Sequence, residues 1–163
     1  MLISLSCIFP SDDIKKTAAY YEQKLGFSAV AYLDSMEPHI CLYRDSTEII
    51  LLQTKGNKFA PHHVLYGYGY DAYFYTRHQQ ELLDEFISKS VAVVKPLSVT
   101  DYKNNEFVIE DIDGRWIGFG IKEESLLRCY VLHTQRLRAN LARSSAIQIQ
   151  KYRLSCPIRR YSV

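Results

Sequence analysis

Side chains that could do chemistry gather at alternating positions in the segment 39–48. His39 and Cys41 lie two residues apart in a β-like run, so they could serve as a base and a nucleophile. A lone cysteine in a strand is more often a small buried hydrophobic residue. Glu48 could act as a general base, or it could be a rim carboxylate paired with Arg44 or Lys55. Spacing alone leaves these roles open.

The other histidines and the cysteines do not follow the spacing of a metal site. His62 and His63 are adjacent in a segment rich in turn-forming residues, and we expect them to be solvated loop side chains. The four cysteines are widely spaced and form no C-x-x-C pair: Cys7, Cys41, Cys129 and Cys156. This pattern indicates neither a zinc knuckle nor a disulfide scaffold, and it predicts reduced thiols in a cytoplasmic protein.

Length and composition are those of one globular domain. The chain has 163 residues, of which 47% are hydrophobic and 23% charged, which excludes a disordered chain. It has no apolar run long enough to cross a membrane, and the first ten residues lack the basic start of a secretion signal. We therefore expect a cytoplasmic protein that has no membrane partner.

Charge divides the chain into two parts. Residues 1–124 hold 12 basic and 18 acidic residues, a net charge of −6, whereas residues 125–163 hold 8 basic residues and no acidic one, a net charge of +8. The acidic body argues against nucleic-acid binding. The basic extension, residues 123–163, shows helical spacing of apolar residues up to about residue 143, and we expect disorder beyond it. It could alternatively serve an interaction protein as a docking helix.

The elements that would position the candidate side chains repeat along the body. Residues 2–8 predict a strand, and Ser11 is the expected N-cap of a helix that Gly26 ends. Three further strands are expected at 27–33, 39–44 and 47–53. The same order of strands and helix follows at 70–76, 80–90, 91–94, 106–110 and 115–121. The fold class is therefore α+β, with two β-α-β-β-β modules at about 1–55 and 68–122.

Three runs carry a family resemblance. They are D-I-K-K-T-A-A-Y-Y-E-Q-K-L-G-F at 13–27, T-E-I-I-L-L at 47–52 and N-E-F-V-I-E-D-I-D-G-R-W-I-G-F-G at 105–120. Together they resemble the vicinal oxygen chelate superfamily, which includes glyoxalases, extradiol dioxygenases and the fosfomycin and bleomycin resistance proteins. The resemblance covers residues 1–122 and implies a cup-shaped mixed sheet (the glyoxalase/bleomycin resistance fold).

The resemblance also implies where a metal would be held. Metal-dependent members place ligands at four positions that correspond here to Ser6, Glu48, Tyr70 and Gly118. Only Glu48 among these is an ordinary ligand of a divalent transition metal. We therefore expect no metal and no cofactor.

Strand alternation predicts the lining of the cup. Pairing about Asp45-Ser46 sets Tyr43 opposite Glu48, and the aliphatic face of the same hairpin is expected to pack against a helix. Tyr70, Ala72 and Phe74 would share one face, and so would Trp116, Gly118 and Gly120, where the glycines leave room for a flat ring. The expected ligand-binding residues are Ser6, Glu48, Tyr70, Phe74 and Trp116. Trp116 could alternatively be a core side chain.

The function that follows is metal-independent binding of a small organic molecule, a drug or metabolite, as the resemblance to bleomycin resistance proteins implies. The resemblance also implies a homodimer that completes the cup. The alternative is an enzyme: a glyoxalase-like lyase or isomerase, or a dioxygenase-related enzyme with a non-standard site.

Overall fold

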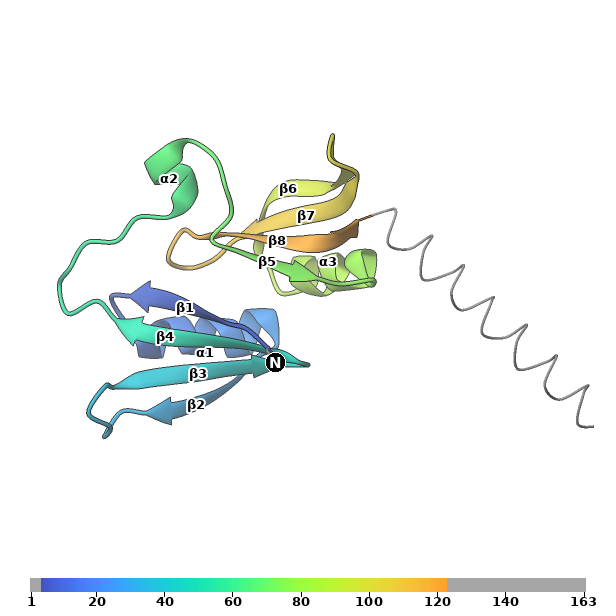
Figure 1. Cartoon of the computed structure of the whole chain (residues 1–163). Coiled ribbons are helices and arrows are strands. Elements are labelled where there is room, and N and C mark those ends of the chain that lie inside the picture. Colours follow the sequence, from blue (N-terminus) through green and yellow to red (C-terminus); the bar gives the residue numbers. More distant parts are fainter. Residues whose placement is uncertain (1–3, 123–163) are drawn as a thin grey trace, which may run out of the picture. The chain divides into compact units, whose positions relative to one another are not determined.

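A computed structural model describes residues 4–122, which form two modules with the same order of elements (Figure 1). The first module consists of β1 (Ser6–Ser11), α1 (Ile14–Leu25), β2 (Ser28–Tyr32), β3 (His39–Arg44) and β4 (Thr47–Gln53). The second consists of β5 (Ala72–Tyr75), α3 (Gln79–Ser88), β6 (Ala92–Val99), β7 (Asn104–Glu110) and β8 (Trp116–Lys122). The α+β class and the repeated β-α-β-β-β order are confirmed. A short helix that was not predicted, α2 (His62–Tyr66), lies in the connection between the modules.

The first sheet has the strand order β1-β4-β3-β2, with β1 parallel to β4. The predicted hairpin register is confirmed, because Tyr43 pairs with Glu48 and Cys41 with Ile50. The aliphatic face packs against α1 as expected, and Leu42, Ile49 and Leu51 are fully buried there. Ser6, Glu48 and the other alternate residues therefore lie on the face away from the helix, and we call this helix-free face of each sheet its concave face.

The start of α1 differs from the prediction. Ser11 is the last residue of β1, and the N-cap is Asp13, whose carboxylate accepts a hydrogen bond from the backbone N–H of Lys16 at 3.0 Å. β1 continues past the expected end at residue 8 because its parallel partner β4 extends to Gln53, opposite Ser11. The strand thereby carries Pro10 and Ser11 next to the first turn of the helix.

The second sheet has the order β5-β8-β7-β6, with β5 parallel to β8. Its buried face is aromatic: Phe119 stacks on Phe107 and on Phe74, with ring centroids 5.3 Å apart in both pairs, and Phe86 of α3 meets Phe119 edge-on. β6 is longer than predicted, since it extends to Val99 through two register irregularities opposite β7.

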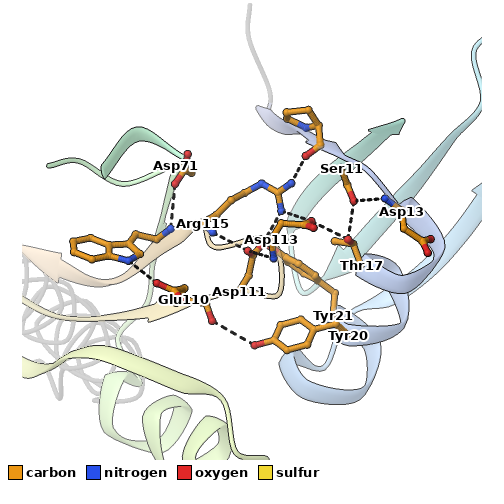
Figure 2. A network of polar contacts seen from close by, with 12 residues as sticks. Ser11, Asp13, Thr17, Tyr20, Tyr21, Asp71, Glu110, Asp111, Asp113 and Arg115 are labelled. Carbon is orange, nitrogen blue, oxygen red and sulfur yellow. Dashed lines mark hydrogen bonds and ion pairs between the residues drawn. The ribbon is translucent and has the colours of Figure 1, made fainter. Parts of the chain in front are cut away.

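A buried polar network joins the two modules at the β7–β8 turn (Figure 2). The Arg115 guanidinium, with 2% of its side chain exposed, lies 2.7 Å from Asp111 Oδ2 and 2.9 Å from Asp113 Oδ2. It also donates a hydrogen bond to the Pro10 carbonyl of β1. From α1, Tyr21 donates to Asp111 and Thr17 donates to Asp113, each at 2.8 Å. Every charge in this network therefore has a partner, as a buried charge requires.

No helix of the described part of the chain is long and apolar enough to cross a membrane. The predicted extension, 123–163, lies outside the described residues.

Candidate functional site

The concave face of the first module carries one carboxylate, Glu48, that accepts hydrogen bonds from its neighbours. Ser6 faces Glu48 across the β1–β4 pair and donates a hydrogen bond to its Oε2. This hydrogen bond, together with one from Tyr43, holds the pKa of Glu48 below its ordinary value. Glu48 is thus a stabilised carboxylate and a weak base. It is not paired with Arg44, whose guanidinium instead binds Glu85 at 2.7 Å.

The possible base and nucleophile of this face point to different partners. His39 stacks on Tyr32, with ring centroids 5.0 Å apart, and its Nδ1 lies 2.7 Å from the Glu37 carbonyl oxygen. Cys41 is 6% exposed and contributes a hydrogen bond that helps to lower the pKa of Glu48. His39 and Cys41 therefore interact with different partners, which is not the arrangement of a base and its nucleophile.

The concave face of the second module contains a carboxylate surrounded by phenols. Glu106 is 3% exposed and accepts hydrogen bonds from Tyr70 at 2.7 Å, Tyr73 at 2.8 Å and Tyr102 at 2.5 Å. Asn104 donates a fourth at 3.3 Å. We call these three tyrosines and Glu106 the tyrosine cluster. Burial favours a raised pKa of Glu106, but the hydrogen bonds outweigh burial and the pKa lies below its ordinary value.

A lysine lies at the edge of the tyrosine cluster. Lys95 Nζ is 5.0 Å from the centroid of the Tyr70 ring and 5.2 Å from that of Trp116, which is cation–π distance in both cases. Beside it is a hollow of about 280 Å³. The hollow is lined by Tyr70, Lys95, Ser98, Thr100, Asp101, Tyr102, Glu106 and Val108. An ammonium, hydroxyls and aromatic rings converging on one hollow can bind a polar aromatic molecule.

The space expected above Gly118 and Gly120 is filled. A Cβ at Gly118 would lie 2.7 Å from the Tyr73 ring, and one at Gly120 would lie 2.5 Å from both Glu106 Cβ and Tyr73 Oη. The glycines therefore make room for Tyr73 of the tyrosine cluster. The prediction that their missing side chains leave a free place for a ligand ring is wrong.

The predicted face shared by Tyr70 and Phe74 is also wrong. Phe74 stacks on Phe119 in the hydrophobic core, whereas Tyr70 lies with Tyr73 on the concave side. Tyr70 precedes β5, so the alternation of faces along the strand does not extend to it. Between Tyr70 and the strand, the Asp71 carboxylate accepts a hydrogen bond from the Trp116 backbone N–H at 3.1 Å. Phe74 therefore does not share the concave face with Tyr70.

Trp116 lies near Lys95 as part of the concave side, but one of its ring faces is covered. The His63 ring stacks on the indole at a centroid distance of 4.2 Å and an angle of 8°. The indole Nε1 donates to Glu110 Oε2 at 3.1 Å. His63 was expected to be a solvated loop side chain, and this expectation is wrong.

The residues present do not fit the metal of the metal-dependent relatives. Within residues 4–122, no three His, Cys, Asp or Glu side chains are grouped so that they could hold a metal ion. At the positions that the resemblance assigns, Glu48 is hydrogen-bonded to Ser6, Tyr70 donates to Glu106, and Gly118 has no donor atom.

Comparison with known proteins agrees with this fold. Residues 5–119 match the family model of the Glyoxalase/Bleomycin resistance protein/Dioxygenase superfamily, so the chain belongs to that superfamily. No curated protein matches the chain.

Solved structures share the fold at low sequence identity. A superfamily member from Sphaerobacter thermophilus has a TM-score of 0.59 and 18% identity, over 74% of this chain and 97% of that one. The fosfomycin resistance protein FosX from Listeria monocytogenes has a TM-score of 0.56 and 16% identity, over 78% and 99%. An integron cassette protein from V. Cholerae has a TM-score of 0.53 and 24% identity, over 74% and 96%. At these identities the likeness extends to the fold alone.

Proposed function

We propose that this protein binds a small organic molecule without a metal, in the manner of bleomycin resistance proteins, and that the binding site is the hollow beside the tyrosine cluster. One observation supports this most strongly: Lys95 lies over two aromatic rings at the edge of a hollow lined with hydroxyl groups. Its ammonium can meet a polar acceptor on a ligand whose rings contact Tyr70 and Tyr102.

The proposed assembly is a homodimer. The concave face of the first sheet exposes apolar side chains on both of its edge strands, Ile8 on β1 and Val30 and Tyr32 on β2, which are 60%, 42% and 44% exposed. Exposed apolar side chains gathered on one face are typical of protein interfaces. The hollow is also at the lower end of the volumes that enclose a drug-sized ligand. A second copy would cover these apolar side chains. It would also enclose the hollow further.

The enzyme alternative has less support. A glyoxalase-like lyase or isomerase that used Glu48 as its base would need a carboxylate with a raised pKa, but hydrogen bonds from Ser6 and Tyr43 lower it. We also propose a cytoplasmic location, because Cys7 and Cys41 are free thiols.

Replacing Lys95 with methionine tests the proposed site. A binding compound is first found by calorimetry in a panel of glycopeptide drugs and aromatic metabolites. Since a hydrogen bond to a charged group contributes about 1.5–3 kcal/mol, Lys95→Met should weaken the binding of that compound by about tenfold or more. Lys58→Met, at an exposed position in the connection between the modules, is the matched control and should bind like the parent. Equal affinities for Lys95→Met and the parent would place the ligand elsewhere.

A further inference from the structure

The indole of Trp116 is held in one position by contacts on two sides. The backbone N–H of Trp116 donates to Asp71 Oδ2, which anchors the main chain, and the indole Nε1 donates to Glu110 Oε2, each at 3.1 Å. Lys95 Nζ lies 5.2 Å from the ring. A ring fixed in this way is preorganised to stack with a planar partner.

The present stacking partner, His63, comes from a weakly supported element. α2 has five residues and none of them is buried, with Val64, Leu65 and Tyr66 at least 57% exposed. A helix of this length is not stable by itself. Its other contacts to the second module include two from His62, whose backbone N–H donates to Asp71 Oδ1 and whose Nδ1 meets the Tyr70 carbonyl oxygen.

The His63 ring fits its place incompletely. It lies nearly parallel to the indole, at 8° and 4.2 Å, as a bound planar ligand would. However, its Nδ1 is shielded from solvent and has no hydrogen-bond partner. A shielded polar atom without a partner has a free-energy cost, which is relieved when the ring leaves.

We propose that His63 occupies a ring-binding site on Trp116, and that this site accepts a planar aromatic ligand when α2 moves aside. The inference rests on the proposed function, since it adds the Trp116 ring to the same concave side of the second module. The ligand class is a flat aromatic molecule with a polar acceptor within reach of Lys95. His63 competes with this ligand. The apparent affinity is therefore the intrinsic affinity multiplied by the fraction of molecules in which the His63–Trp116 stack is open.

The test uses quinoline as a planar probe of the full-length protein. Trp116 is the only tryptophan, so its indole N–H gives one resolved signal in a nitrogen-15 correlation spectrum, and the shift of that signal reports binding. His63→Ala should bind quinoline about two- to tenfold more tightly than the parent, because the competing stack is removed. Acrylamide should also quench the tryptophan emission more strongly in this variant.

Two further variants make the outcome decisive. Val64→Ala changes an exposed residue of the same helix and should leave both readouts unchanged, whereas His63→Phe keeps a ring on the indole and should not bind more tightly than the parent. The proposal is overturned if His63→Ala, folded as judged by circular dichroism, binds quinoline and is quenched like the parent. It is also overturned if Val64→Ala tightens binding equally, because the helix and not the imidazole would then be the cause. If Lys95→Met bound its compound like the parent, the hollow would not be the binding site. The effect of His63→Ala on quinoline binding would still be interpretable by itself.

Discussion

Arg115→Met should lower the free energy of unfolding by about 3–5 kcal/mol, the usual cost of removing one partner of a buried ion pair. Arg115 is the cation of the network that joins β1 and α1 to the β7–β8 turn, and its loss leaves Asp111 buried without its counter-ion. Burial already raises the pKa of Asp111 in spite of the guanidinium. Urea unfolding followed by circular dichroism measures the change.

The matched control for this prediction is Lys89→Met. Lys89 forms an ion pair of the same 2.7 Å length with Glu85, but about a third of each side chain is exposed. Solvent-accessible ion pairs contribute about 0–1 kcal/mol to the free energy of unfolding, so this variant should unfold nearly like the parent. The double variant Asp111→Asn with Arg115→Met should recover part of the loss, because the more deeply buried of the two uncompensated carboxylates is gone and only Asp113 remains. Equal stabilities of Arg115→Met and Lys89→Met would show that the network does not hold the modules together.

Glu106→Gln should lower the free energy of unfolding by about 1.5–3 kcal/mol at pH 7, since it removes the charge to which three phenols donate. The folded protein lowers the pKa of Glu106, so the carboxylate stabilises the fold fully above its ordinary pKa of about 4.5. This contribution is lost as the pH falls through the lower, folded-state pKa. The difference between parent and variant should therefore be largest at neutral pH and shrink below about pH 4.5.

Glu85→Gln is the control for the predicted pH dependence of stability. Glu85 also has a lowered pKa, but its side chain is 31% exposed and its partners, Arg44 and Lys89, are 23% and 34% exposed. Solvent screening keeps such pairs weak, so the stability loss should stay within about 1 kcal/mol. Parallel pH profiles for Glu106→Gln and the parent would contradict the proposed role of the tyrosine cluster.

Local patterns were sufficient to predict the modules and the register of the first hairpin. Alternation in 39–44 and 47–53, with a two-residue turn between them, fixed the pairing of Tyr43 with Glu48 and the face toward α1. The resemblance assigns Ser6 and Glu48 to family ligand positions, and the structure adds that they are neighbours across the parallel β1–β4 pair. Their role as ligand-binding residues stays a prediction.

The tyrosine cluster could not be predicted in the same way, because its members come from separate elements and a loop. Tyr70 lies outside β5, so counting every second residue assigned Phe74 to the wrong face and missed Tyr73. Tyr102 is in the β6–β7 turn, and Lys95 follows a register irregularity in β6. Gly118 and Gly120 were the available signal. Their missing side chains predict open space, whereas the Tyr73 ring fills it.

A native mass spectrum of the full-length protein, purified without chelator, measures metal content, bound ligand and the number of chains together, and so tests metal-independent ligand binding. We expect a species of two chains that retains a small organic molecule and carries no divalent metal. A stoichiometric zinc, nickel, manganese or iron ion in each chain would contradict metal-independent binding and would favour the enzyme alternative.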